Sequence, residues 1–164
     1  MRVFTLAGTQ VQELPALPEA LPAQGFVWIA CSRTGFAQHQ AALQRTLERL
    51  CGHTLVDLHV SDLLNPQLPS RFDYSAHYDL MVFRRLASRE PSAASLQPAA
   101  KRPGPPVLQR IDTSPVGFAV FDRVLLSVHP ADCAIREAYA TRLQAASSQA
   151  LQAQGEPDTR SVGA

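Results

Sequence analysis

The sequence predicts an α/β (α+β) chain in which strands dominate, with helices after the third strand and at the end. Three observations support this. Short runs rich in β-branched and aromatic residues alternate with turn residues, as strands do. Residues 36–51 carry an apolar stripe at helical spacing, and a second stripe follows residue 130. With 164 residues, 46% of them hydrophobic and 18% charged, the chain has a globular composition and not that of a disordered or coiled-coil chain.

The N-terminal part predicts a hairpin and a buried strand. Arg2–Ala7 and Val11–Leu14 have strand character, and Gly8 supplies the turn between them. Phe26–Cys31 is a continuous apolar run that suits a central strand covered on both faces. Trp28 lies within this run, so we expect its side chain to pack in the core.

A helix is predicted over residues 36–51. Ser32 or Thr34 can cap its start, and Gly52 stands where a left-handed C-terminal cap belongs. Leu55–His59 then has the composition of a strand, and Ser61–Asn65 predicts a single helical turn closed by a proline.

The second half predicts four further strands, over 71–74, 78–86, 116–121 and 123–128. Residues 87–106 contain five prolines and no apolar periodicity, which predicts a mobile loop within one domain.

The last predicted element is a helix that starts after Pro130. Its expected buried stripe is Ile135, Tyr139, Leu143 and Ala146. Because the stripe weakens afterwards, we divide the chain into a domain over residues 1–146 and a frayed helix start or disordered tail over 147–164.

Charge and hydropathy exclude several classes of protein. A net charge of +1 gives no field that would attract nucleic acid or an anionic membrane. No run reaches the roughly 20 apolar residues that span a bilayer, and the N-terminus does not resemble a secretory signal. Three cysteines without Cys-x-x-Cys spacing indicate a reduced, cytosolic protein without disulfides or a thiolate zinc site.

No enzyme motif is found, and we expect a non-enzymatic protein without an organic cofactor. Cys31 ends an apolar strand, where burial raises the pKa of a thiol and makes it inert. Cys133 at a helix start is a better candidate nucleophile, but a small core residue is the preferred interpretation.

Residues that ligate metals are concentrated in one stretch. Residues 53–79 hold three of the five histidines and four of the eight aspartates: His53, Asp57, His59, Asp62, Asp73, His77 and Asp79. Imidazole with carboxylate suits zinc or nickel, whereas carboxylate with water suits magnesium. The alternative is that these are ordinary turn and surface residues, with Asp62 contributing roughly 1 kcal/mol or less as a cap.

Several pieces occur together in a specific order. They are Phe-Val-Trp-Ile-Ala at 26–30, Leu-His-Val-Ser-Asp-Leu-Leu-Asn at 58–65, the aromatic-rich run 72–84, the hairpin 115–129, and Ile-Arg at 135–136. In this order the chain resembles the cytoplasmic N-terminal domain of the CorA-type divalent-cation transporters, including their zinc-transporting branch. It departs from them at Ala30, at the scrambled Pro69-Ser70-Arg71 segment, and in having no Gly-Met-Asn pore signature.

The resemblance implies a mixed sheet of six to seven strands flanked by helices, with a C-terminal helix leading into a stalk. It implies the soluble regulatory domain of a homopentameric transporter at the cytoplasmic face of the cell (inner) membrane. The transported and sensed ion would be Mg²⁺, with Zn²⁺, Co²⁺ and Ni²⁺ as alternatives. By position Asp62 matches the family's regulatory metal ligand, exposed at an edge of the subunit, and His59 is a second candidate.

Two other functions stay open. One is a stand-alone soluble interaction module of the same fold. The other is a zinc- or nickel-binding protein that uses the His53–Asp79 cluster. The chain on its own is expected to be a monomer or a dimer.

Overall fold

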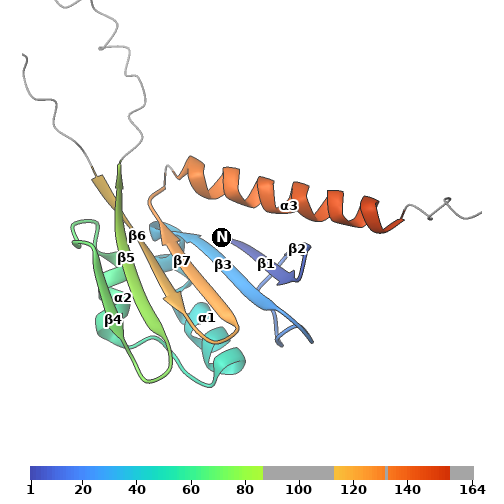
Figure 1. Cartoon of the computed structure of the whole chain (residues 1–164). Coiled ribbons are helices and arrows are strands. Elements are labelled where there is room, and N and C mark those ends of the chain that lie inside the picture. The colour runs from blue at the N-terminus through green and yellow to red at the C-terminus, as the bar shows by residue number, and fades with distance from the viewer. Residues whose placement is uncertain (87–112, 132, 156–164) are drawn as a thin grey trace, which may run out of the picture.

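The structure, a computed structural model, describes residues 1–86, 113–131 and 133–155 (Figure 1). The predicted mobile loop over residues 87–106 lies outside the described residues. The elements are β1 (Arg2–Ala7), β2 (Gln10–Leu14), β3 (Phe26–Ser32), α1 (Arg33–Cys51), α2 (Asp57–Leu64), β4 (Arg71–Tyr74), β5 (Asp79–Leu86), β6 (Thr113–Val120), β7 (Val124–His129) and α3 (Ala134–Gly155).

The described strands form one seven-stranded sheet in the order β2-β1-β3-β7-β6-β5-β4. Only the central pair is parallel: Val27 of β3 lies opposite Val124 of β7, and the register continues to Ser32 and His129. The other neighbouring strands are antiparallel. The predicted fold class, a mixed sheet of six to seven strands flanked by helices with a helix at the C-terminal end, is confirmed.

Helix α1 begins at Arg33, three residues before the predicted start, and ends at Cys51 as predicted. The Ser32 hydroxyl accepts a hydrogen bond from the Gly35 backbone N–H at 3.0 Å, so Ser32 is the N-cap. At the other end, Gly52 adopts a positive φ of 74° and its N–H donates to the Glu48 carbonyl at 2.8 Å. The apolar stripe of α1 includes Phe36, Leu43 and Leu47, all buried against the sheet.

The predicted strand Leu55–His59 is wrong, because α2 starts at Asp57. The residues of α2 that are buried are His59, Val60, Asp62 and Leu63, a spacing of three to four that puts them on one helical face. As a helix, α2 covers the sheet where Gly117 of β6 leaves room for the Leu63 side chain.

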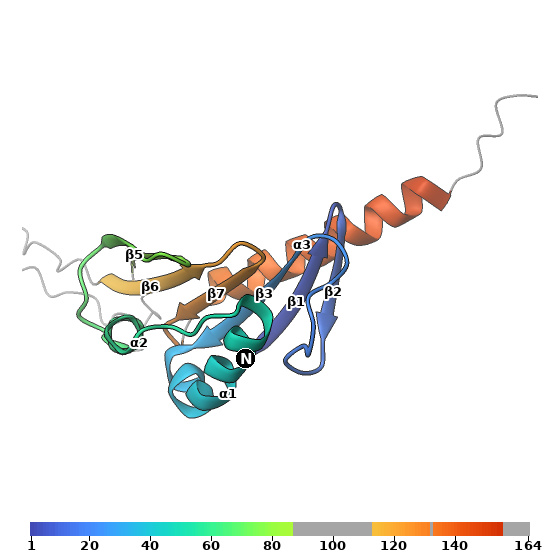
Figure 2. The same ribbon diagram turned by 90° about the horizontal axis from the view of Figure 1, so that it is seen from below.

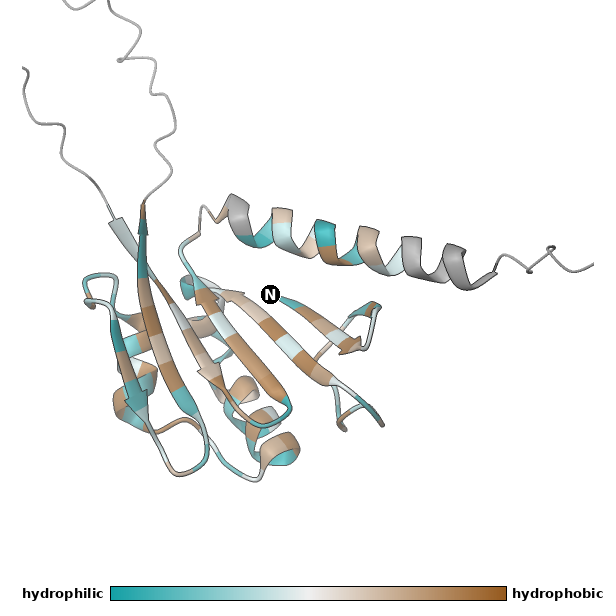
Figure 3. Cartoon of the chain, in the orientation of Figure 1, coloured by the Kyte–Doolittle hydropathy of each residue, from teal (hydrophilic) through white to brown (hydrophobic). Residues whose placement is uncertain are grey.

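The two faces of the sheet are covered unequally. Helices α1 and α2 lie on one face, and α3 lies across the other over the β1–β3 side (Figures 1 and 2). The larger core lies under α1 and α2. A smaller one joins α3 to Phe4, Trp28 and Ala30. Figure 3 shows long apolar stretches on the central strands and a mixed surface on α3.

The buried stripe of α3 differs from the predicted one. Ala140 and Ser147 are buried and Leu143 is partly buried, whereas Tyr139 is 56% exposed and Ala146 is exposed. Small residues face the sheet because the bulky partners, Phe4 and Trp28, project from the strands. Helix α3 runs to Gly155, and the division of the chain at residue 146 stays a prediction.

Candidate functional site

The predicted metal-ligand stretch separates into two groups of side chains in the structure. His59, Asp62 and Asp73 meet in a polar network between α2 and β4. His53 and His77 meet elsewhere, where the loop after α1 approaches the turn between β4 and β5. Topology and not sequence spacing therefore decides which of these residues are neighbours.

The polar network is centred on His59, which is only 4% exposed. Its Nδ1 lies 2.8 Å from the Tyr78 hydroxyl, and its Nε2 lies 3.3 Å from Asp73 Oδ2. The Tyr78 oxygen also accepts a hydrogen bond from the Val56 N–H at 3.0 Å. All these contacts are satisfied together when Tyr78 donates to Nδ1 and Nε2–H donates to Asp73. The sequence offered no signal for the role of Tyr78.

Arg71 connects the other end of this network to Asp62. One guanidinium nitrogen donates to Asp73 Oδ2, and Nη1 lies 3.1 Å from Asp62 Oδ2 as an ion pair. Hydrogen bonds from His59 and then from Arg71 hold the pKa of Asp73 below its usual value. The Asp62 side chain is only 9% exposed, whereas the resemblance implied an exposed one, because it faces Arg71 of β4, the strand at one edge of the described sheet.

The donor atoms of His59 and Asp62 face other side chains in this structure. Both ring nitrogens of His59 have partners, and the Asp62 carboxylate already faces the positive charge of Arg71. Within the described residues, no group of three or more His, Cys, Asp or Glu side chains is arranged to hold a metal ion. Metal binding by Asp62 or His59 therefore stays a prediction, and it would require Arg71 to leave Asp62.

Replacing Asp62 with alanine should lower the free energy of unfolding by about 1–3 kcal/mol, because it removes the partner of a half-buried guanidinium. This is more than the roughly 1 kcal/mol expected of a capping residue. Urea unfolding of Asp62→Ala, Arg71→Ala and the double variant would measure the coupling between them. Asp57→Ala, on the exposed side of α2, is the control and should cost less than about 1 kcal/mol. If the losses in unfolding free energy of Asp62→Ala and Arg71→Ala simply added up in the double variant, the two side chains would not stabilise each other, and the ion pair would be contradicted.

A second polar chain lies under the start of α3. Trp28 Nε1 donates to Ser127 Oγ at 2.8 Å, Ser127 Oγ lies 2.9 Å from His129 Nε2, and His129 Nδ1 lies 3.3 Å from Cys133 Sγ. Cys133 and His129 are 4% and 7% exposed, so a substrate has no access to the thiol. This supports the interpretation of Cys133 as a small core residue. Cys31 is fully buried, and burial raises its pKa to about 11.

His129 should make the fold less stable in mild acid. Burial first, and then the charges of Arg136 and Arg85, lower its pKa from 6.5 to about 4, while Glu137 acts in the opposite direction. The unfolded chain therefore takes up a proton below pH 6.5 that the folded chain does not bind. The free energy of unfolding should fall by up to about 1.4 kcal/mol per pH unit between pH 6.5 and 4.

Thermal unfolding across this pH range would measure the effect. His129→Gln should reduce the slope, and His39→Gln, an exposed position on α1, should leave it unchanged. If stability fell equally with pH in the wild-type chain and in His129→Gln, a group other than His129 would cause the fall, and the prediction would be wrong.

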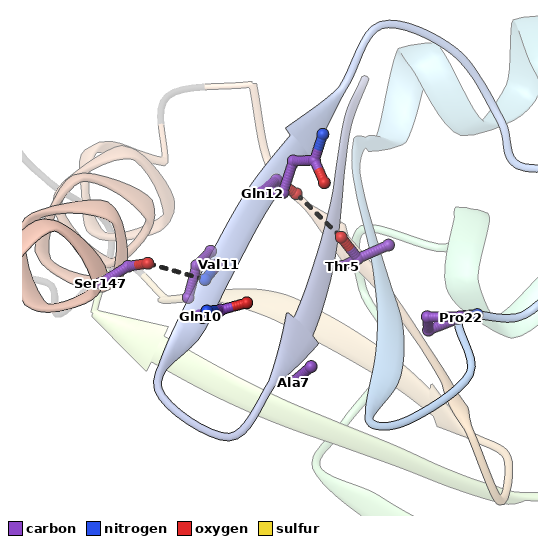
Figure 4. Close-up of a pocket in the computed structure, with 7 residues that line it drawn as sticks. All are labelled: Thr5, Ala7, Gln10, Val11, Gln12, Pro22 and Ser147. Carbon is purple, nitrogen blue, oxygen red and sulfur yellow. Dashed lines mark hydrogen bonds between the residues drawn. The ribbon is translucent and has the colours of Figure 1, made fainter. Parts of the chain in front are cut away.

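A pocket of about 370 Å³ lies where α3 meets the edge strand β2 (Figure 4). Residues of β1 and β2 line it together with Pro22 and Ser147, and none of the lining side chains is charged. The Val11 N–H donates to Ser147 Oγ at 2.9 Å across it. The pocket therefore marks the contact between α3 and the β1–β2 hairpin, and none of its lining residues offers a carboxylate to Mg²⁺.

Comparison of the structure with solved structures gives several matches over nearly the whole chain. The cytoplasmic domain of ZntB from Vibrio parahaemolyticus RIMD 2210633 matches with a TM-score of 0.55 and 12% identity, over 88% of this chain. The complete CorA magnesium transporter from Methanocaldococcus jannaschii matches with a TM-score of 0.54 and 13% identity, over 99% of this chain. The chain has the fold of the CorA and ZntB cytoplasmic domains.

The full-length CmaX protein also matches, with a TM-score of 0.56 and 17% identity over 90% of this chain. The chain spans 39% of CmaX, 50% of the ZntB domain and 40% of CorA. No family model matches the sequence, and no curated protein matches it. Among the helices that the structure describes, none is long and apolar enough to cross a membrane.

Proposed function

We propose that this chain is the cytoplasmic domain of a CorA-like divalent-cation transporter, and that it regulates the pore of that transporter without catalysing a reaction. The observation that carries the proposal is the fold, which matches parts of CorA and ZntB over 88–99% of the chain. A shared fold does not by itself fix a function, so the proposal depends on the transport experiment below.

The position of α3 supports the proposal. The helix lies on the sheet at its N-terminal end, where Arg2 pairs with Glu137 at 2.7 Å and with Glu13 at 2.8 Å. It runs to Gly155 and extends beyond the sheet in both views (Figures 1 and 2). A helix that packs on the hairpin as far as Ser147 and then continues to Gly155 can transmit a movement of the domain to the residues beyond it.

In this proposal Mg²⁺ is the transported and sensed ion, with Zn²⁺, Co²⁺ and Ni²⁺ as alternatives. The full-length protein is expected to be a homopentamer at the cytoplasmic face of the cell membrane. No ion is assigned to Asp62 or His59 of this chain, because their polar atoms face Arg71, Asp73 and Tyr78.

A complementation experiment tests the proposed function. The complete reading frame that contains this chain is expressed in a bacterial strain without magnesium uptake systems, and growth and cation uptake are measured at low Mg²⁺. We expect rescue by the complete protein and none by residues 1–164 alone. The coding sequence after Ala164 should encode two apolar spans of roughly 20 residues each.

Failure of the complete protein to carry Mg²⁺, Zn²⁺, Co²⁺ or Ni²⁺ would overturn the proposal. If the reading frame also ended at Ala164, the stand-alone interaction module would become the better interpretation.

A further inference from the structure

The two edges of the sheet are covered differently. At the β2 edge, the Val11 N–H donates to Ser147 Oγ of α3 at 2.9 Å. Strand β4 forms the other edge, and no described strand lies beyond it (Figure 1). Its four residues, Arg71–Tyr74, include neither the lysine nor the proline that protect many natural edges from pairing. Within the described residues, β4 is therefore the edge at which the sheet can accept another strand.

The backbone of β4 directs hydrogen-bonding groups outward at two residues. At the turn that joins β4 to β5, the Ser75 N–H donates to the Tyr78 carbonyl at 3.0 Å. Such hydrogen-bonded pairs recur at every second residue of an antiparallel pair, so the N–H and C=O of Asp73 face β5. Those of Phe72 and Tyr74 therefore face away from the sheet, and they form no hydrogen bond to a described residue.

The side chains of Phe72 and Tyr74 leave β4 on the face of the sheet away from α2. Asp73 lies between them and faces His59 of α2 at 3.3 Å, and successive residues of a strand point to opposite faces. The two aromatic side chains are exposed and meet edge to face, with ring centroids 4.5 Å apart. An exposed aromatic pair beside outward backbone groups is suited to contact with an added strand.

An exposed apolar side chain also lies beside this edge on the other face of the sheet. Asp62 of α2 pairs with Arg71 of β4 at 3.1 Å, so this side of α2 is turned toward the edge strand. Leu58 precedes Asp62 by four residues, and residues four apart share one face of a helix. The Leu58 side chain is 61% exposed. Apolar groups that a partner can cover therefore flank β4 on both faces.

We propose that β4 pairs antiparallel with β4 of a second copy of this chain, across a two-fold axis that places Phe72 opposite the second copy's Phe72. The outward N–H and C=O of these two residues then bond to each other reciprocally. In this register Arg71 lies opposite the second copy's Asp73, which places opposite charges across the contact. A shift by one residue would place the two Asp73 carboxylates opposite each other, and like charges in that position are unfavourable.

The charge pattern of the edge favours a second copy as the partner. Arg71 and Asp73 alternate with the aromatic residues, and a two-fold axis brings this pattern onto its own complement. Both side chains are about one-third exposed, 33% and 34%, so each can reach across the contact. Because each copy contributes only a four-residue strand, the dimer should be weak and depend on protein concentration.

The inference goes beyond the proposed function and does not rest on it. It concerns an interaction surface between copies and involves neither a pore nor an ion. Its test uses residues 1–164 in solution without transport, so that a failed uptake experiment and a failed dimerisation experiment are separate results.

The experiment is sedimentation of the purified chain over a wide range of protein concentration. The average mass of the wild type should rise from one chain toward two. Phe72→Lys and Phe72→Glu each place like charges opposite one another at the axis, so each variant alone should stay monomeric. An equal mixture of the two variants should dimerise again, because lysine then lies opposite glutamate.

Two comparisons separate loss of pairing from loss of folding. Phe72 is 49% exposed, so thermal unfolding of both Phe72 variants should stay close to that of the wild type. Phe83→Lys and Phe83→Glu are matched controls, because Phe83 is an aromatic residue of similar exposure, 55%, on β5 inside the sheet. Both controls should dimerise as the wild type does.

Three results would overturn the proposal. A wild-type chain that stays monomeric at every concentration would leave the β4 edge to a strand of another protein. Dimers that persist in both Phe72 variants would place the contact elsewhere on the chain. Monomeric Phe72 variants whose mixture also stays monomeric would exclude the register that places Phe72 opposite Phe72.

Discussion

Replacing Trp28 with alanine should lower the free energy of unfolding by about 3–5 kcal/mol. The indole is 6% exposed and stacks on Phe4 with ring centroids 5.1 Å apart. The ring of Tyr139 meets it edge-on at 5.9 Å, and its Nε1 donates to Ser127 at 2.8 Å. Truncation removes the largest side chain between the sheet and α3, and the small residues that α3 presents there cannot fill the space.

Chemical denaturation would measure the loss, and two variants show where it comes from. Trp28→Phe keeps most of the apolar volume and removes the indole N–H, so it should cost much less than alanine. Phe83→Ala, on β5 with 55% of its surface exposed, is an aromatic control that should change stability by no more than about 1 kcal/mol. A cost for Trp28→Ala as small as that of Phe83→Ala would contradict the described packing of α3.

Replacing Gly25 with alanine should lower the free energy of unfolding by about 2–5 kcal/mol. Gly25 has a φ of 81°, and a Cβ atom added there would lie 1.8 Å from the Leu6 carbonyl oxygen. The left-handed conformation costs an alanine about 1–2 kcal/mol, and the clash with backbone adds a packing cost of about 1–3 kcal/mol. Since Leu6 pairs with Phe26 in the sheet, neither backbone can withdraw without breaking the start of β3.

Gly8 provides the matched control for Gly25. It also has a positive φ, 57°, but a Cβ added there meets no atom within 4 Å. Gly8→Ala should therefore show only the conformational cost of about 1–2 kcal/mol. The difference between the two variants in thermal or urea unfolding measures the close approach at Gly25. Equal losses at both positions would show that the clash is relieved.

Much of the fold could be predicted from local sequence. The apolar run at 26–31 and the capped stripe of α1 are local patterns with a single interpretation, and the structure has them at almost the predicted boundaries. Leu55–His59 could not be assigned correctly, because a five-residue segment with three apolar residues fits a strand or a helix equally well. The offset stripe of α3 has a similar cause, since alanine and serine carry little hydropathic information.

The candidate site could be predicted only as a list of residues. The stretch 53–79 does contain both groups of polar side chains, but pairing of β4 with β5 and the direction of α2 decide their partners. Arg71 neutralises Asp62, and Tyr78 occupies one nitrogen of His59. The stacking of His53 on His77 likewise depends on a loop and a turn that are 24 residues apart in sequence and become neighbours only after the sheet forms.

The single parallel contact in the sheet has a consequence for biosynthesis. Strand β3 can pair with β7 only after β7 has been synthesised. Val124, the first residue of β7, lies nearly a hundred residues after its partner Val27 in the sequence. Until the ribosome has released β7, β3 presents one unpaired edge, and such edges recruit other chains. Nascent or truncated forms that end before β7 should therefore depend on chaperones and accumulate as insoluble material. The complete sheet closes that edge with the last strand to be made.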